Sequence, residues 1–453
     1  MNSFQIDRQT LEDLNLLGKY KSNSIFSLFN LTVTKGGEMA LERMFLEPLT
    51  DAVEINERRR MFEFFQKTEF QFPVEKEELD KAEQYLTNGE ARSFAASMMN
   101  SFKRKAMKLI ANDQELEMLQ HGMNAAISLF INLESFFKKF DSLDATCPYR
   151  TIASKALELL HDKGLAWIYS GEDVASCGTS TFARYDYRLR YAYSSQINEL
   201  LGLLYDLDLY IAVAKVGRGR GFSFAEAVMQ EETIVDITGL YHPTVPNAVD
   251  NDLRIDHESN LIFLTGANMA GKSTLMKAFG VTLYLAHMGF PLPVSSMQFT
   301  PIDGMYTSIN VPDNLNMGYS HFYAEVKRVK DVAIAVSSGK RLAVIFDELF
   351  KGTNVKDAYD ATVAVTDAFS KHRRCIYIVS THIMEAGATL REMCDNMKFV
   401  YLPTLLQGST PVYTYRLNEG ISDDRHGMMI INNERIIETI RKTTEQPQIQ
   451  QAL

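Results

Sequence analysis

One stretch decides the fold class of this chain: residues 261–274, which read LIFLTGANMAGKST. An apolar run, Leu261–Thr265, precedes the pattern G-x-x-x-x-G-K-S at Gly266–Ser273, and residues 274–286 after it are compatible with a helix. In this order of strand, loop and helix, the glycines let backbone N–H groups turn onto a polyphosphate at the positive end of the helix. The alternative is a glycine-containing turn that matches by chance, and the flanking segments argue against it.

Individual residues of this P-loop have separate predicted roles. Lys272 reaches the terminal phosphates of ATP, and the hydroxyl of Ser273 takes one position around Mg²⁺. Asn268 is expected to contact the γ-phosphate. The predicted nucleotide-binding residues of the loop are Gly266, Ala267, Asn268, Met269, Ala270, Gly271, Lys272, Ser273 and Thr274.

Two further apolar runs end in residues that suit phosphoryl transfer. Residues 342–346 lead into Asp347, predicted to hold the Mg²⁺ shell, and Glu348, predicted to orient and polarise the attacking water. An Asp-Glu pair at a strand end is common by itself, and its position after a P-loop makes it informative. The third run, residues 375–380, is followed by His382, which suits a sensor of the γ-phosphate. A structural histidine is the alternative there.

Composition bounds the class of protein. With 453 residues the chain is long enough for two or three domains, and 46% hydrophobic with 23% charged residues is typical of a soluble globular protein. The four cysteines have neither zinc spacing nor a disulfide framework, so we expect a reducing, cytoplasmic location. Residues 1–7 have no signal-peptide pattern, and the longest apolar stretch, 279–294, contains His287 and two prolines. No membrane partner is therefore expected.

The charge balance restrains any prediction of nucleic-acid binding. A net charge of −10 argues against wholesale coating of nucleic acid, although phosphate contact depends on local clusters rather than on the total. Basic clusters occur at residues 103–108 and 215–220. A solvated helix face or a loop is the favoured interpretation of each cluster over a nucleic-acid site.

Hydrophobic periodicity divides the chain in two. The first part shows three-and-four spacing typical of helices at 38–46, 54–66, 76–85, 115–139, 152–161 and 194–213. From residue 231 strands and helices alternate, which favours a mainly parallel sheet covered on both faces. We predict an α + α/β protein: an elongated helical lever domain, residues 1–228, followed by a P-loop ABC-type ATPase domain, residues 229–453. The late runs 397–402 and 412–417 are expected to form a hairpin at the sheet edge.

Four motifs resemble those of the MutS family of DNA mismatch repair ATPases. Residues 265–274 (TGANMAGKST) resemble that family's T-G-P-N-M-G-G-K-S-T, with Ala267 and Ala270 as departures. Residues 318–325 (GYSHFYAE) are similar to its G-x-S-x-F-x-x-E signature, residues 347–353 to its D-E-x-x-x-G-T, and residues 380–382 to its S/A-T-H. Before residue 228, the stretches 27–37 and 48–58 resemble, more weakly, the start of its core or lever domain.

The resemblance implies several further features. The signature serine, Ser320, acts on the nucleotide of the partner, so the protein is a homodimer and Ser320 is a catalytic residue in trans. Asp357 lies near the dimer seam. The family's N-terminal mismatch-reading domain is not expected here, because the lever-like sequence begins close to residue 1, and the DNA clamp is reduced or absent. The segment 246–252 lacks the family's stacking aromatic; Tyr415 could stack on adenine instead, and an ordinary strand tyrosine is equally consistent.

The predicted function is a MutS-like DNA-binding ATPase, an ATP-gated dimeric switch in mismatch repair or recombination. Its DNA could be duplex, mispaired or branched, and a repair-protein partner is possible in addition. The alternative is a nucleotide-gated assembly protein whose levers bind a protein rather than DNA, a hypothesis that the negative net charge favours. A small-molecule kinase is disfavoured, because it would need neither residues 318–325 nor the helical lever.

Overall fold

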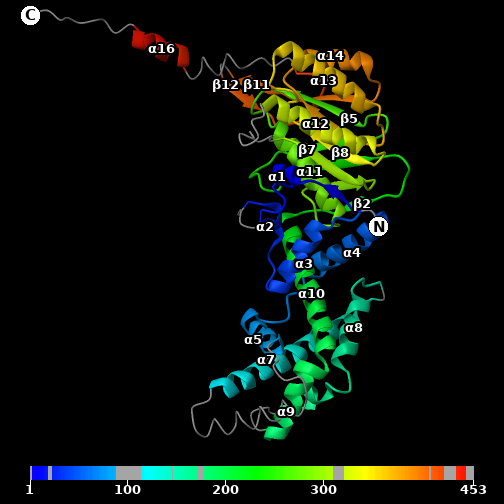
Figure 1. Cartoon of the computed structure of the whole chain (residues 1–453), viewed down its shortest axis with the longest axis vertical. Helices are drawn as coiled ribbons and strands as arrows, with labels where there is room; N and C mark the ends of the chain where they lie inside the picture. Colours follow the sequence, from blue (N-terminus) through cyan, green and yellow to red (C-terminus); the bar gives the residue numbers. More distant parts are fainter. Residues whose placement is uncertain are drawn as a thin grey trace, which may run out of the picture. The chain divides into compact units, whose positions relative to one another are not determined.

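A computed structural model describes residues 3–18, 23–87, 114–144, 146–170, 177–309, 321–407, 410–422 and 435–444 (Figure 1). The chain splits into two compact units, and neither is continuous in sequence. The sheet unit comprises Met1–Leu28, Phe45–Arg59 and Arg220–Leu453; the helical unit comprises Phe29–Met44 and Arg60–Gly219. These units differ from the single division predicted between residues 228 and 229. The physical reason is that strand β1 (Gln5–Ile6) pairs with β7 (Gly304–Ser308) and so joins the main sheet.

The six helices predicted from periodicity are present, with ends moved by at most seven residues: α3 Lys35–Leu46, α4 Ala52–Thr68, α5 Lys76–Thr87, α7 Gln114–Phe137, α8 Arg150–Leu160 and α10 Ser194–Arg220. Helix α9, Thr179–Tyr187, was not predicted. The helical unit shares α3, α4 and α10 with the residue ranges of the sheet unit. Its core is rich in aromatic rings, among them Phe65, Phe130 and Tyr149. One buried ion pair lies in this unit: Arg190 Nη2 donates to Asp186 Oδ2 at 2.7 Å, and Tyr85 donates to Asp186 Oδ1.

The main sheet of the sheet unit has the strand order β1-β7-β8-β9-β5-β10-β13. Its central strands are β8 Leu342–Phe346, β9 Ile376–Ser380 and β5 Leu261–Gly266, and every residue in them is buried. All neighbours pair in parallel except β10 (Met397–Leu402) with β13 (Asn418–Glu419). The prediction of a mainly parallel sheet is confirmed.

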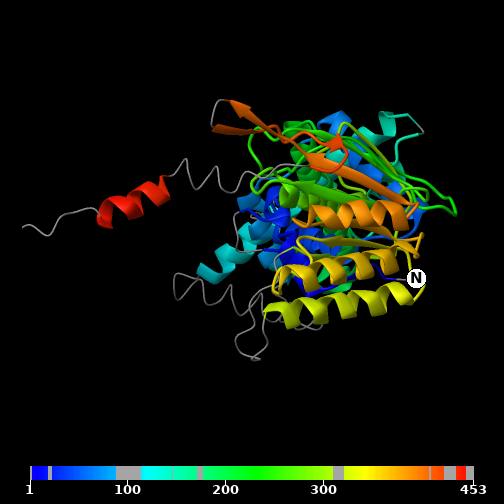
Figure 2. The same cartoon turned by 90° about the horizontal axis from the view of Figure 1, so that it is seen from above.

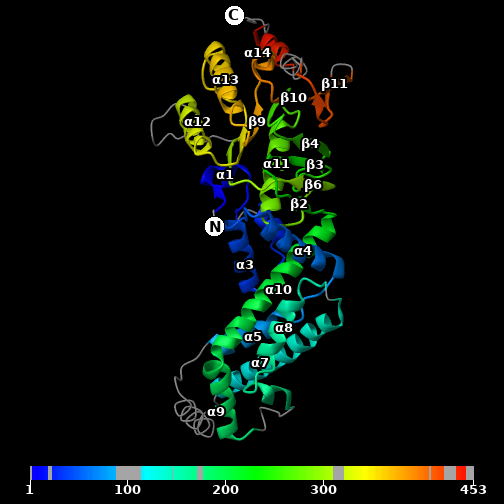
Figure 3. The same ribbon diagram turned by 90° about the vertical axis from the view of Figure 1, so that its right-hand side faces the viewer.

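Helices cover both faces of this sheet, as continuous apolar strands require. On one face lie α12 His321–Ser337, α13 Val355–Ser370 and α14 Met384–Met393, which run side by side in yellow to orange in Figure 2. On the other face lies α11 Lys272–His287 (Figure 3). Because parallel strands end at the same edge, the residues that follow β5, β8 and β9 are brought together there.

A smaller four-stranded sheet, ordered β2-β6-β3-β4, completes the sheet unit. Its strands are β2 Ala225–Ala227, β6 Ser296–Phe299, β3 Val235–Leu240 and β4 Asn251–Ile255. The remaining described α-helices are α1 Arg8–Asp13, α2 Ile25–Phe29 and α16 Ile436–Thr444. Within the described ranges, no helix is both long and apolar enough to cross a membrane.

The predicted late hairpin is wrong. Strand β10 pairs in parallel with β5 over six positions, and the hairpin is formed instead by β11 Thr404–Gln407 and β12 Thr410–Tyr413. Strand β10 lies within the main sheet because its apolar side chains must be buried there: Val400 and Leu402 are each 1% exposed. Tyr415 consequently lies after a strand rather than on one, with a left-handed φ of 56°.

Candidate nucleotide-binding site

The loop between β5 and α11 has the backbone of a phosphate-binding turn. Gly266 has φ 142° and Gly271 has φ 103°, values that L side chains rarely adopt, and Met269 is left-handed at 69°. Helix α11 begins at Lys272 directly after Gly271, so its free backbone N–H groups face the loop. The positive end of the α11 dipole therefore points to where an anion would sit.

Lys272 points back into this loop. Its Nζ donates to the carbonyl oxygens of Gly266 at 2.8 Å and Ala267 at 3.2 Å, and the residue is 5% exposed. Burial lowers the pKa of the Lys272 ammonium, while the charges of Glu348 and Asp347 act in the opposite direction. A polyphosphate in the loop would supply the negative charge that favours the protonated amine.

Asp347 and Ser273 meet at the carboxyl edge of the sheet. Ser273 donates from Oγ to Asp347 Oδ2 at 2.5 Å, and Ser380, the last residue of β9, donates to Asp347 Oδ1. The backbone N–H of Asp347 is bonded to the carbonyl of Ser308 at 2.9 Å. A hydroxyl beside a carboxylate, both oxygen donors, fits the ligand chemistry of Mg²⁺. Ser380 was not predicted to have this role, although it belongs to the quoted Ser-Thr-His stretch.

Glu348 and His382 form the second pair of the site. Oε1 of Glu348 lies 2.5 Å from Nε2 of His382, and Lys351 Nζ lies 3.8 Å from Oε2. The hydrogen bond to His382 lowers the pKa of the Glu348 carboxyl; burial works against this, and the charges of His382, Lys351 and Lys272 add to the lowering. The carboxyl is therefore ionised at neutral pH. The backbone of Glu348 is left-handed, with φ 55°, and its N–H donates to the Ser380 carbonyl.

A cavity of about 520 Å³ opens beside this loop. One wall is the loop with Lys272, Ser273 and Glu348, and the other is the segment from Leu240 to Asn251. Tyr415 also lines it, and the Tyr415 Cδ1 atom lies 3.1 Å from where a Cβ of Gly271 would be. Asn251 Nδ2 donates to the Tyr415 carbonyl at 3.0 Å, and the N–H of Leu417 donates to Asn251 Oδ1.

His242, in the second wall, has its pKa lowered to about 4 by burial and by the charge of Lys277. It therefore offers a neutral imidazole to the cavity at neutral pH. Asn251 and His242 were not predicted as site residues. Asn251 lies in the segment 246–252, but its own contacts could not be predicted locally, because its partners Tyr415 and Leu417 are far away in the chain.

The structure brings together the loop residues 267–274, Glu348 and Tyr415 around one cavity, with Gly266, Asp347 and His382 bonded to cavity-lining residues. Ser320 lies outside the described residues. Asp357 is exposed in the first turn of α13, where its N–H donates to the side chain of Asn354, the N-cap of that helix.

Comparisons with known proteins agree with the motifs. A sequence model of MutS domain III matches residues 9–351, and one of MutS domain V matches residues 262–450. A DNA mismatch repair protein MutS from Lactococcus lactis subsp. lactis (strain IL1403) is 27% identical over 244 residues. Another, from Lactococcus lactis subsp. cremoris (strain MG1363), is 25% identical over 244 residues. Each match covers 52% of this chain and 29% of the relative's length. Because the domain III match alone spans well over half of its length, the chain belongs to the MutS family.

Proposed function

We propose that this chain binds and hydrolyses ATP with Mg²⁺ and acts as a dimeric, ATP-gated switch on DNA in mismatch repair or recombination. One observation carries the ATPase part. Lys272, Ser273, Asp347 and Glu348, distant in sequence, converge on the loop at the start of α11 beside a cavity of about 520 Å³. The arrangement matches what phosphoryl transfer needs: cradling, charge neutralisation and one positioned water.

In this mechanism the triphosphate replaces the loop carbonyls as the partner of Lys272. Ser273 and Asp347 would hold Mg²⁺, which neutralises charge developing on the phosphate oxygens. Glu348, ionised and oriented by His382, accepts a hydrogen bond from the attacking water and aligns it in line with the γ-phosphate. His382 bonds the γ-phosphate while it is present. Once the γ-phosphate has left, His382 is hydrogen-bonded only to Glu348. The pair thereby senses whether hydrolysis has occurred.

The switch requires two copies, because Ser320 is proposed to complete the nucleotide site of the partner chain. ATP then closes two sheet units on each other and hydrolysis releases them. Addition of a non-hydrolysable ATP analogue to the purified full chain should double its mass in analytical ultracentrifugation. A Lys272→Ala chain, treated identically, is the control and should stay a monomer. A wild-type chain that remains monomeric with the analogue bound would contradict the dimeric part.

DNA is the proposed target of the helical unit, in line with the printed function of the relatives. ATPase rates should be compared without DNA and with duplex, mispaired or branched DNA, at two salt concentrations. DNA contacts made through phosphates predict a stimulation that fades as salt rises. The net charge of −10 supports the competing hypothesis, in which the helical unit binds a protein. Lack of response to any of the three DNAs would favour that hypothesis.

A further inference from the structure

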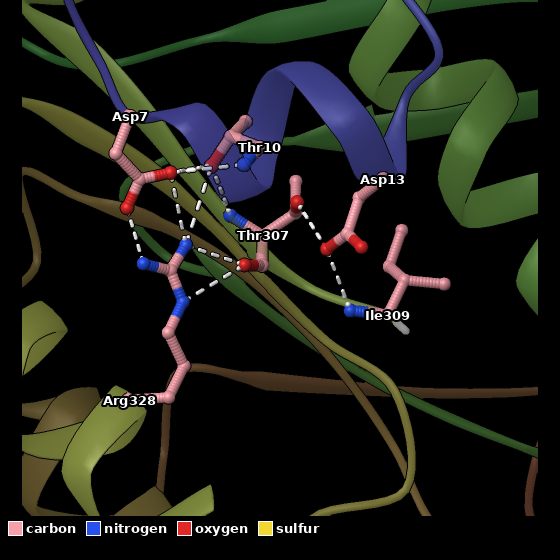
Figure 4. A network of polar contacts seen from close by, with 6 residues as sticks. All are labelled: Asp7, Thr10, Asp13, Thr307, Ile309 and Arg328. Atoms are coloured by element: carbon pink, nitrogen blue, oxygen red, sulfur yellow. Dashed lines mark hydrogen bonds and ion pairs between the residues drawn. The ribbon is translucent and has the colours of Figure 1, made fainter. Parts of the chain in front are cut away.

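A polar network, buried except at Asp7, ties residues Asp7–Asp13 to strand β7 and helix α12 (Figure 4). Asp7 caps α1 by accepting from the Thr10 N–H at 2.9 Å, and it is ion-paired with Arg328 of α12. Arg328 also donates from Nη2 to the carbonyl of Thr307 at 2.6 Å. Burial raises the pKa of the Asp7 carboxyl, but the hydrogen bonds from Arg328 and Thr10 together outweigh it and hold that pKa below its usual range.

The same network holds the end of β7 from both sides of Ser308. Thr10 Oγ1 accepts from the Thr307 N–H at 3.0 Å, and Asp13 Oδ2 accepts from the Ile309 N–H at 2.9 Å. Asp13 Oδ2 also accepts from Thr307 Oγ1 at 2.7 Å. Between these two anchored residues, the carbonyl of Ser308 accepts the N–H of Asp347, the residue next to Glu348. A shift of the β7 end is thus passed on to the site directly.

A second connection runs through α12. Its second residue, Phe322, packs edge-on against Phe350, two residues after Glu348, with ring centroids 6.2 Å apart. A Cβ atom at Gly352 would lie 2.9 Å from the Phe322 nitrogen, so only glycine permits this approach. The turn that follows β8 contains two non-glycine residues with a left-handed backbone, Glu348 and Phe350. Such a turn persists only where its surroundings hold it.

A contribution to folding stability does not by itself explain why this network is built from charged and hydroxyl side chains. Buried charged pairs are commonly no more stabilising than apolar residues of the same volume, whereas a fully bonded buried network specifies one geometry. Here Thr10 and Thr307 are 0% exposed and Asp13 is 4% exposed, while the side chains of Arg328 and Asp7 are 8% and 33% exposed. We propose that the network of Asp7, Thr10, Asp13, Thr307 and Arg328 is a positioning element for hydrolysis, which sets the turn carrying Glu348 through β7 and α12. This inference rests on the proposed ATPase function.

Thr10→Val is the sharpest test, because it removes one hydroxyl with almost no change in volume. We expect kcat for ATP to fall about tenfold or more, since small misplacements of a positioned group are costly. The nucleotide Kd should stay within about twofold of wild type, because Lys272 and its loop are not touched. Thr10→Ser keeps the hydroxyl and should restore kcat. Thr366→Val removes another buried hydroxyl of the sheet unit, one with no hydrogen-bond partner among the described residues, and should leave kcat unchanged.

A double-mutant cycle that combines Thr10→Val with Phe322→Leu tests whether Thr10 and Phe322 both act through the turn that carries Glu348. If both residues act on the same turn, the double variant should lose less than the product of the two single losses in kcat. If Thr10→Val does not fold, as judged by circular dichroism, Arg328→Lys takes its place, because it keeps the charge but not the planar fork.

Two results would overturn the inference while leaving the ATPase proposal intact. One is a Thr10→Val enzyme with wild-type kcat; the other is strictly multiplicative losses in the cycle. A wild-type chain with no Lys272-dependent turnover would overturn both proposals together.

Discussion

Nε2 of His382 lies 2.5 Å from Oε1 of Glu348. These residues follow β9 and β8, which are adjacent parallel strands, so the sheet itself sets their separation. The contact has a consequence for pH, because the hydrogen bond from His382 is the main cause of the lowered pKa of Glu348.

Replacement of His382 by alanine should move the acid limb of the ATPase pH profile to higher pH. Glu348 acts as a carboxylate, so turnover falls as pH drops through its pKa, and loss of the hydrogen bond raises that pKa. The kcat profiles of wild type and variant between pH 3.5 and 8 measure the shift. Lys351→Ala is the matched control: its ammonium lies 3.8 Å from Glu348 and is half exposed, so its effect should be smaller. An unmoved acid limb in His382→Ala would remove His382 from this role.

Lys272 and Glu348 should separate binding from hydrolysis. Lys272→Ala removes the cation that faces the phosphates and should abolish nucleotide binding in calorimetry. Glu348→Gln keeps the shape of the side chain but not its charge, so it should bind ATP normally and hydrolyse it on the order of 10²–10³ times more slowly. Binding that disappears in both variants, or full turnover in Glu348→Gln, would refute these roles.

Gly271→Ala should damage the site by strain and by contact. At φ 103° an L side chain is strained, and the added Cβ would lie 3.1 Å from the ring of Tyr415. We expect weaker nucleotide binding and a loss of stability of about 1–3 kcal/mol. Gly339→Ala is the control, since Gly339 also has a left-handed φ, 79°, with open space around it. It should lose some stability and keep nucleotide affinity, and a similar loss of affinity in both variants would exclude the Tyr415 contact as the cause.

His287 should make the sheet unit sensitive to mild acid. It is 0% exposed, lies between the Leu49 carbonyl and the Ile302 N–H, and burial lowers its pKa to about 4. The unfolded chain has a histidine pKa near 6.5, so the unfolded state binds the proton first and stability falls as pH drops from about 6.5 towards 4. The full effect is about 3 kcal/mol.

His287→Gln keeps a donor and an acceptor without titrating, so its stability should depend less on pH than that of wild type. Urea unfolding followed by circular dichroism, from pH 7.5 to 5, compares the two slopes. His242→Gln separates the contribution of the other low-pKa histidine. Parallel slopes for wild type and His287→Gln would show that His287 does not titrate as argued.

Local patterns predicted much of the fold and of the site. Most helices of the helical unit follow from apolar spacing, and the buried strands β5, β8 and β9 from uninterrupted apolar runs. Because the carboxyl ends of parallel strands meet at one edge, the motif order alone predicts that Lys272, Asp347 and His382 come together. The hairpin prediction failed because nothing in residues 397–402 indicates which strand they pair with. They pair with β5, where Val400 and Leu402 are buried.

The sequence by itself determined the chemistry: a glycine-rich loop before a helix, two carboxylates after one strand and a histidine after another, all set by short-range spacing. Only the tertiary structure decided what orients those groups. The network from Asp7 to Arg328, the bond of Ser380 to Asp347 and the anchoring of Tyr415 by Asn251 join residues far apart in the chain. Such contacts depend on how the elements pack, and no local pattern of residues records that packing.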